Sequence, residues 1–314
     1  MANTSSLKLG WIGIGRMGHS MAERLAKAGA DLTVWNRTRA KAEPLAAVGA
    51  KVAGSLVELA ACDIVFVMVS TWDDVKEVVS GPGGLLSGPG APGMVVECSS
   101  ISLEGSAELR ALLAARGTQM LAAPVSGNAK VIKAGRLSFV CSGPRAAFDA
   151  ALPSLKAIAP AASYVGDGEL ARIVKICHNV FLGVVIQSLA EITVLAQKAG
   201  VPRHAFREFM NQSVMGSTFS RYKSPALVNL DFKVTFTPKL LRKDLDLGLD
   251  AARHFGVPMP LASITRDLIQ TLIGHGMDEE DFAKLIVLQA RASGLELVPE
   301  DVPVDDGLSP GAKA

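Results

Sequence analysis

Short apolar runs alternate with amphipathic segments from residue 8 to about residue 165. Near-continuous apolar runs are typical of strands buried on both faces, and they cover 9–14, 31–35, 63–70, 93–99, 119–123 and 137–142. The segments among them have helical spacing and cover 16–28, 39–48, 55–61 and 102–115. This alternation predicts a parallel sheet with helices on both faces.

The strand pattern stops at about residue 168. One long helix is predicted over 169–199, because Gly200 and Pro202 follow its last turn. Further helical patterns cover 203–213, 239–255, 261–275 and 279–293. We therefore expect a doubly wound α/β domain over 1–166 and an all-α domain over 167–297, joined by the long helix. Residues 298–314 carry acids and prolines without periodicity, which predicts a mobile tail.

The long helix is apolar around most of its circumference. A small helical domain cannot cover such a helix alone, so we expect a second subunit to bury part of it. The pattern thus predicts a homodimer or a higher homo-oligomer.

Charge and hydropathy narrow the choice of partners. The 314 residues contain 32 Lys and Arg against 30 Asp and Glu, with no basic run, which argues against nucleic acid or an anionic membrane surface as a partner. The longest apolar stretch, 180–196, contains polar residues and is shorter than the roughly 20 residues of a membrane span. The first ten residues lack the layout of a signal peptide. We expect a soluble, cytoplasmic protein.

Cysteine and histidine are scattered along the chain. The four cysteines, which contain no CxxC pair, are Cys62, Cys98, Cys141 and Cys177. Together with only five dispersed histidines they predict buried thiols in a reducing compartment, with no disulfide framework and no metal site.

A glycine pattern links the first predicted strand to the first helix. The G-x-G-x-x-G segment consists of Gly13, Ile14, Gly15, Arg16, Met17 and Gly18. In this setting the first glycine allows a tight turn, the second lets the backbone approach a pyrophosphate, and the third lets the helix pack on the strand. The N-terminus of the helix then offers N–H groups to phosphate. The segment predicts a dinucleotide site on a Rossmann domain.

The end of the second strand indicates which dinucleotide is bound. NAD-preferring sites place an acid there, whereas this chain has Asn36, Arg37 and Thr38. Arg37 can pair with a 2′-phosphate and Thr38 can donate a hydroxyl hydrogen bond. We expect NADP, with NAD as the alternative.

Five segments in a fixed order resemble the β-hydroxyacid dehydrogenase family, which includes 3-hydroxyisobutyrate dehydrogenase, tartronate semialdehyde reductase, glyoxylate/succinic semialdehyde reductases and, more distantly, 6-phosphogluconate dehydrogenase. The resemblance covers residues 8–295, and its segments are 13–18, 97–102, 123–128, 168–179 and 243–249. It implies a Rossmann domain, an all-α domain and hydride transfer involving a small hydroxyacid.

Lys175 and Asn179 lie four residues apart, so they project from one face of the long helix. A lysine on such an apolar helix either extends its ammonium group to solvent or exchanges a proton with a carbonyl oxygen. The resemblance implies that Lys175 is the catalytic lysine and that Asn179 orients the substrate. His178 has no assigned role and reads best as a packed, hydrogen-bonded histidine.

Ser126 and Gly127 follow an apolar run and read either as a plain turn or as a carboxylate-binding loop. The resemblance implies the second role. Asn128 replaces a glycine of the family and is expected to bring a polar side chain to the pocket wall. The resemblance also places Val69, Ser70 and Ser100 beside the coenzyme and implies that Lys243 reaches towards it. Without the resemblance, Lys243 and Asp244 read as a solvated helix surface.

Residues 213–232 follow no clear pattern. Phe219, Tyr222 and Phe232 read as core aromatics or as the wall of a cleft. Arg221 and Lys223 read as solvated charges or as contacts for an anionic substrate.

The combined interpretation is an NAD(P)-dependent oxidoreductase that moves a hydride between nicotinamide and a small β-hydroxyacid or semialdehyde, with Lys175 as general acid and base. Two alternatives stay open. An imine reductase uses a similar fold but typically has another residue in place of Lys175, and a non-enzymatic cofactor-binding scaffold would be expected to have lost that lysine.

Overall fold

The structure is a computed structural model that describes residues 7–308. The chain divides into two compact units, Met1–Lys175 and Ile176–Ala314. The division falls nine residues after the boundary expected at 166, because the first turns of the long helix bind to the first unit through Ala171 and Arg172.

The main sheet of the first unit has six parallel strands in the order β3-β2-β1-β4-β5-β6. Its strands are β1 (Lys8–Ile12), β2 (Asp31–Trp35), β3 (Lys51–Val52), β4 (Ile64–Val67), β5 (Met94–Glu97) and β6 (Gln119–Ala122). The strand order reverses beside β1, and ligands of open α/β sheets bind at the carboxyl ends of the strands at such a point.

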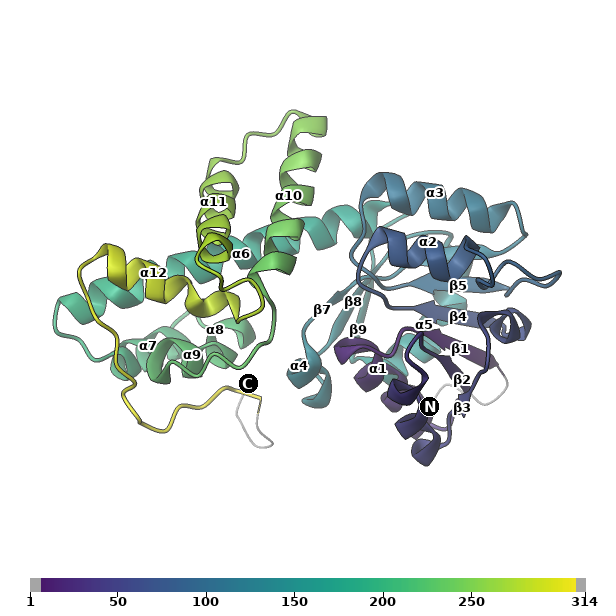
Figure 1. Cartoon of the computed structure of the whole chain (residues 1–314), viewed down its shortest axis with the longest axis horizontal. Helices are drawn as coiled ribbons and strands as arrows, with labels where there is room; N and C mark the ends of the chain where they lie inside the picture. Colours follow the sequence, from purple (N-terminus) through teal and green to yellow (C-terminus); the bar gives the residue numbers. More distant parts are fainter. Residues whose placement is uncertain (1–6, 309–314) are drawn as a thin grey trace. The chain divides into compact units, whose positions relative to one another are not determined.

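Helices cover both faces of this sheet, as the apolar runs predict. They are α1 (Arg16–Lys27), α2 (Trp72–Ser80), α3 (Leu103–Ala114) and α5 (Arg145–Ile158). Helices α1 and α5 lie on one face of the sheet, and α2 and α3 lie on the other (Figure 1). Trp11 and Phe66 belong to the core that includes residues of α1 and α5, whereas Ile12 and Val67 belong to the core that includes residues of α2 and α3. The fold is therefore the expected doubly wound sheet.

Two local predictions differ from the structure. Residues 39–48 and 55–61 form short 3₁₀ helices, η1 (Arg39–Lys41), η2 (Glu43–Val48) and η3 (Leu56–Ala61), instead of α-helices. Residues 137–142 contribute to a second sheet of β7 (Val125–Ser126), β8 (Ser138–Cys141) and β9 (Ala161–Tyr164), in which β7 is antiparallel to β8. The short helix α4 (Ala129–Lys133) lies between β7 and β8 in the chain.

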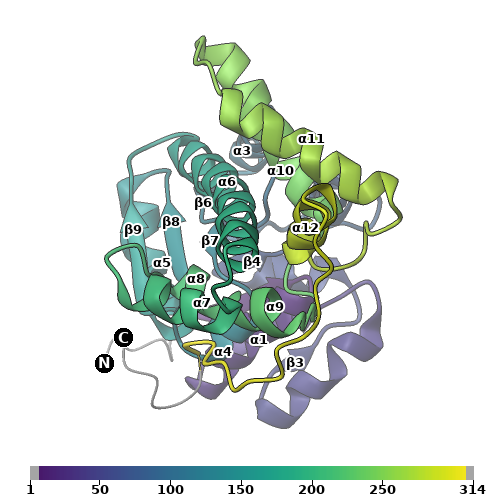
Figure 2. The ribbon, with the colours of Figure 1, turned by 90° about the vertical axis from the view of Figure 1, so that its left-hand side faces the viewer.

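All regular elements in the described residues of the second unit are helices. It contains most of α6 (Leu170–Lys198), then α7 (Arg203–Gln212), α8 (Thr218–Tyr222), α9 (Ser224–Asn229), α10 (Pro238–Phe255), α11 (Pro260–Gly274), η4 (Phe282–Lys284) and α12 (Leu285–Ala292). Figures 1 and 2 show α10 and α11 side by side as a hairpin, which turns where Gly256 adopts a φ of +68°. Helices α8 and α9 occupy the stretch without a clear sequence pattern.

Both ends of helix α6 lie within one residue of the predicted bounds. By length and composition alone it could cross a membrane, but half of its most apolar window is buried inside the protein. Ile176, Val180 and Ile186 pack there against Leu241 and other residues of the helical core. A core helix of a helical domain has the same length and composition.

Residues 298–308, called the strap below, are bound to the second unit, in contrast to the mobile tail expected there. The carboxylate of Glu300 accepts hydrogen bonds from the backbone N–H groups of Arg203 (2.7 Å) and His204 (2.9 Å) at the start of α7. The amide of Asn229 donates to the carbonyl of Val302 (2.8 Å). Residues 309–314 lie outside the described part of the chain.

Three thiols are buried as expected, whereas Cys177 is exposed on α6, which corrects the prediction for that residue. Burial raises the pKa of Cys62 to about 11 and that of Cys141 to about 12, and it also raises the pKa of Cys98. Within residues 7–308 no group of His, Cys, Asp and Glu is arranged to hold a metal ion.

Candidate functional site

The loop between β1 and α1 has the geometry of a dinucleotide-binding turn. Gly13 has a φ of +98°, and a Cβ there would lie 2.1 Å from the carbonyl oxygen of Met68. A Cβ on Gly18 would lie 1.9 Å from the carbonyl oxygen of Gly13, so the helix packs against the turn only with glycine there. At Gly15 a Cβ would meet no atom within 4 Å, which leaves the backbone open towards solvent. These observations fit a pyrophosphate at the N-terminus of α1.

Asn36 connects this loop to the end of β2. Its Oδ1 accepts from the backbone N–H of Ile14 (2.8 Å), and its Nδ2 donates to the carbonyl of Thr38 (2.9 Å). Arg37 is exposed and forms ion pairs with Glu77 (3.2 Å) and Asp74 (3.6 Å) of α2. Arg37 follows the end of β2, and two acids of α2 share its charge.

The loops after β4 and β5 are tied together. The hydroxyl of Ser99 accepts from the backbone N–H of Val69 at 2.9 Å. Ser70 is exposed and Ser100 is half-buried. Because the carboxyl ends of parallel strands share one edge, the structure brings Val69, Ser70 and Ser100 to the same edge as the glycine loop.

A buried ion pair fixes these loops to the start of α6. Arg172 and Glu97 are almost fully buried and paired, and Arg172 also donates to the carbonyl of Ser99 (2.7 Å) and to the hydroxyl of Ser106 (3.0 Å). The sequence interpretation missed this pair. The available signal was a lone carboxylate at the end of one apolar run and a lone arginine in another.

Ser126 and Gly127 end strand β7 and begin the turn to α4. Gly127 has a φ of +140°, a conformation that favours glycine. The side chain of Asn128 accepts from the backbone N–H of Val131 at 3.1 Å and so caps α4. The oxygen of the Asn128 amide therefore stabilises the start of α4, and the expected place of this side chain at the pocket wall stays a prediction.

Lys175 is half-buried on α6, one turn before Asn179 on the same helix. Asn179 is only 6% exposed, and its Nδ2 donates to Oδ2 of Asp244 on α10 at 2.5 Å. Nδ1 of His178 lies 2.9 Å from Oδ1 of Asn179, in agreement with a packed, hydrogen-bonded histidine. The orientation of the Asn179 amide is thus defined from both ends.

Asp244 is a buried partner of Asn179 that sequence reasoning did not find. It is 4% exposed, and its Oδ1 lies 3.5 Å from Nζ of Lys243, so the expectation of a solvated helix surface is wrong for Asp244. Close helix packing explains the burial, because a Cβ on Gly248 of α10 would lie 2.3 Å from Val180 of α6.

Lys223 belongs to the helical core. Its Nζ lies 2.6 Å from Oδ1 of Asp281 and 4.1 Å from the ring centre of Phe282. Phe219 packs on Phe282 at 6.3 Å, which confirms the core interpretation for this aromatic residue. The expectation of a solvated charge is therefore wrong for Lys223.

Two families of known domains match this chain. The domain described as the NAD binding domain of 6-phosphogluconate dehydrogenase matches residues 8–166. The domain described as NAD-binding of NADP-dependent 3-hydroxyisobutyrate dehydrogenase matches residues 169–289.

Characterised relatives span nearly the whole chain. Glyoxylate/succinic semialdehyde reductase 2 of Arabidopsis thaliana is 30% identical over 93% of this chain and 82% of its own length. The 2-(hydroxymethyl)glutarate dehydrogenase of Eubacterium barkeri is 31% identical over 93% of this chain and 98% of its own. The crystal structure of 3-hydroxyisobutyrate dehydrogenase from Salmonella typhimurium superposes with a TM-score of 0.80 at 29% identity, covering 89% of this chain and 99% of that one.

An imine reductase from Pseudomonas sp. shares the fold at a greater distance, with a TM-score of 0.58 and 19% identity over 90% of this chain and 98% of that one. The glycine loop, the helical second unit and both domain matches agree with one assignment. The chain belongs to the β-hydroxyacid dehydrogenase family and is an NAD(P)-dependent oxidoreductase that acts on CH–OH groups.

Proposed function

We propose that this protein reversibly reduces a small semialdehyde to a β-hydroxyacid and that Lys175 is its general acid and base. The bound nicotinamide supplies the hydride for reduction and accepts it in the reverse direction. In reduction the hydride forms the new C–H bond at the carbonyl carbon, and the Lys175 ammonium donates a proton to the carbonyl oxygen. Asn179 orients the reacting oxygen, and Ser126 and Gly127 hold the carboxylate.

The observation that carries this proposal is that buried hydrogen-bonded residues lie on both sides of Lys175 along α6. Arg172, three residues before it, is anchored by Glu97, and Asn179, four residues after it, is anchored by Asp244. A proton donor must keep a defined position relative to the reacting oxygen, and anchors on both sides of Lys175 support this role.

Replacing the ammonium group tests the role directly. Lys175→Ala is expected to lower turnover by about 10²–10⁴-fold, the usual scale for a proton-transfer group. Its NADPH affinity, measured by fluorescence titration, should stay close to that of the parent. Lys198→Ala, at the other end of α6, serves as the control. Near-normal turnover of Lys175→Ala would reject the proposed acid and base.

We further propose that NADP is the preferred coenzyme. Arg37 carries this preference, because a guanidinium pairs with a 2′-phosphate and an acid at this position would repel it. Arg37→Ala is expected to weaken NADPH binding by about tenfold or more and to leave NADH binding nearly unchanged. Equal losses for both coenzymes would assign Arg37 to another task.

We also propose that the chain acts as a homodimer or higher homo-oligomer in the cytoplasm. Phe181 and Leu195 are 68% and 69% exposed on α6, and their spacing of fourteen residues places them on one helix face. A second copy that packs on this face of α6 would remove both side chains from water. Phe181→Glu with Leu195→Glu should yield monomers in light scattering. An unchanged mass would place the interface elsewhere.

Comparing turnover of different substrates distinguishes the proposed dehydrogenase from an imine reductase. We expect turnover of short semialdehydes and hydroxyacids that exceeds turnover of cyclic imines, because Lys175 occupies the position at which imine reductases differ. The reverse order of rates would favour the alternative. Coenzyme binding without turnover of either panel would favour a scaffold.

A further inference from the structure

Four cationic side chains of the described residues are at most 2% exposed, namely Arg172, Arg203, Arg207 and Lys223. Three of them have a carboxylate within 4.0 Å, through the pairs Arg172–Glu97, Arg203–Glu300 and Lys223–Asp281. For Arg207 no ion pair forms within residues 7–308. A buried charge without a counter-charge destabilises the folded state.

The hydrogen bonding of Arg207 is also incomplete. Its Nη2 donates to the carbonyl of Ser220 (2.8 Å) and weakly to Oδ1 of Asn211 (3.5 Å). Its Nε and Nη1 have no acceptor among the described residues. Burial lowers the pKa of Arg207 to about 10, so the guanidinium is still charged at neutral pH.

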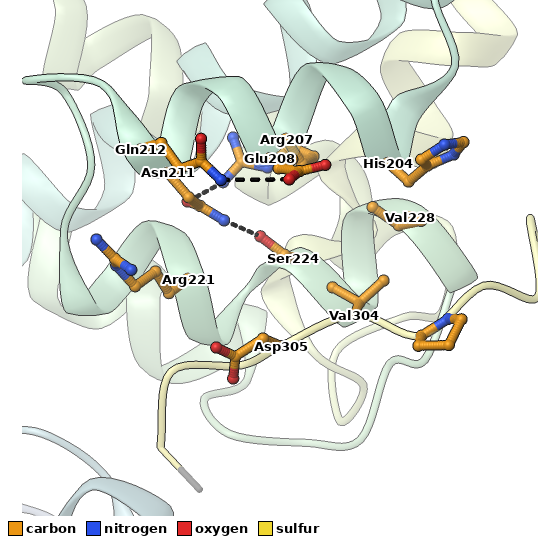
Figure 3. Close-up of a pocket in the computed structure, with 11 residues that line it drawn as sticks. His204, Arg207, Glu208, Asn211, Gln212, Arg221, Ser224, Val228, Val304 and Asp305 are labelled. Carbon is orange, nitrogen blue, oxygen red and sulfur yellow. Dashed lines mark hydrogen bonds between the residues drawn. The ribbon is translucent and has the colours of Figure 1, made fainter. Parts of the chain in front are cut away.

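A pocket of about 350 Å³ adjoins this side chain (Figure 3). Helices α7, α8 and α9 and the strap form its wall, and the nitrogen-bearing side chains on it are His204, Arg207, Asn211, Gln212 and Arg221. Among these lining residues only Arg221 was considered above as a possible substrate contact, and none is part of the proposed hydride-transfer machinery. The pocket therefore needs an explanation of its own.

Two carboxylates also line the pocket without neutralising its arginines. Glu208 accepts from Gln212 (3.2 Å), and Asp305 accepts from the backbone N–H of Gly307 (2.8 Å). Neither lies within 4.0 Å of a guanidinium nitrogen of Arg207 or Arg221. Arg221 is half-buried beside Gly307, where an added Cβ would lie 3.0 Å from its side chain.

We propose that this pocket binds a small oxyanion of the phosphate or polycarboxylate class. Arg221 contacts the anion directly with a planar pair of donors, and Arg207 supplies the buried positive charge behind the wall. Asn211 and Gln212 add neutral amide donors. Binding joins α7 and α8 to the strap, so the anion stabilises the folded second unit. This site is separate from the proposed hydride-transfer site.

The test uses the full-length protein with inorganic phosphate and citrate at 0 to about 20 mM, against sodium chloride at equal ionic strength. We expect a saturable rise of Tm for at least one oxyanion and slower amide exchange in residues 303–305 at saturation. A general salt effect does not saturate in this range and does not depend on single residues. Stabilisation by phosphate alone, by citrate alone or by both then identifies the class of anion that the pocket binds.

Arg207→Met separates ligand binding from simple packing. Removing an unpaired buried charge should leave the Tm without anion equal to or above that of the parent. The apparent affinity for the oxyanion, taken from the dependence of Tm on its concentration, should fall by at least tenfold. Arg221→Gln, at a half-buried position, should show the same loss of affinity and decides the question if Arg207→Met does not fold. Arg253→Gln, on the exposed surface of α10, is the control.

A rise of Tm no larger than with chloride would overturn the proposal. Saturable stabilisation that both Arg207→Met and Arg221→Gln retain would also overturn it, since the anion would then bind elsewhere. Activity is not part of this readout, so failure here leaves the proposed dehydrogenase function untouched.

Discussion

Asn179 on α6 donates a hydrogen bond to the buried carboxylate of Asp244 on α10. The two residues are 65 positions apart in the chain and meet because the glycine at position 248 lets the helices approach closely. An amide that is held in this way presents a fixed orientation. We therefore expect Asp244 to act as a positioning residue for the side chain proposed to orient the substrate.

Asp244→Ala is expected to lower turnover by about 10–100-fold, because it removes a charged hydrogen bond of about 1.5–3 kcal/mol that helps to fix the orientation of the Asn179 amide. Asp244→Asn should fall between this variant and the parent, since a neutral acceptor is weaker. Asp246→Asn, which affects a half-exposed surface pair, should change turnover little. Steady-state kinetics with all three variants measures the effect, and equal losses for Asp244→Ala and Asp246→Asn would contradict the role.

The glycines of the nucleotide loop should separate folding from binding. Gly15→Ala meets no atom within 4 Å and should keep the parent Tm to within a few degrees, yet weaken coenzyme binding by about tenfold or more, because its methyl group occupies space that the pyrophosphate needs. Gly18→Ala forces a Cβ to within 1.9 Å of the carbonyl oxygen of Gly13 and should lower Tm strongly. Calorimetry with and without NADPH distinguishes the two, and parent-like affinity in Gly15→Ala would refute the loop assignment.

One thiol should react in the native protein. At pH 8 the raised pKa values of Cys62, Cys98 and Cys141 keep these groups protonated, and burial blocks access to them. Cys177 is exposed and should account for a single equivalent of iodoacetamide by mass spectrometry, rising to four after denaturation. Cys177→Ser is the control, and fast labelling at any buried thiol in this variant would show that the core opens.

The attachment of the strap should depend on acid pH. Burial tends to raise the pKa of Glu300, but hydrogen bonds from His204 and from the backbone of Arg203 outweigh it and hold the pKa below its usual value. A lowered folded-state pKa means that the stabilisation is complete above the unfolded value of about 4.3 and is lost as the pH falls through the folded value.

Hydrogen exchange of the Arg203 and His204 amides, measured from pH 7 to pH 3 and corrected for intrinsic rates, should therefore lose protection only below about pH 4.3. Glu300→Gln should lack full protection already at pH 7, because the neutral amide accepts more weakly. Protection that is independent of both pH and this substitution would mean that the strap is held by other contacts.

Local patterns in the sequence account for most of the fold. The predicted strand at 31–35 and the predicted helix at 169–199 agree closely with β2 and α6. The periodicity of apolar residues and the glycine or proline that ends an element are local signals, so they can be read from a few neighbouring residues. The three-glycine turn could also be predicted from the sequence: a side chain at Gly13 or Gly18 would clash with neighbouring backbone, and Gly15 leaves open space beside the turn. The 3₁₀ segments and the second sheet could not be predicted in this way, because the conformation of short elements depends on the residues that pack against them.

Charged residues show where local reasoning ends. Asp244 and Lys223 lie in segments that resemble solvated surface when read alone, yet both are buried through partners 65 and 58 positions away. Whether a charge faces water or a partner depends on which helices cross, and the free energy of that choice comes from long-range contacts. Hydrophobic periodicity, glycine and proline at the ends of elements, and the spacing of the loop glycines were therefore enough to specify the two kinds of domain and the coenzyme loop. The partners of the buried charges, the bound strap and the unpaired guanidinium of Arg207 emerged only once distant segments were packed together.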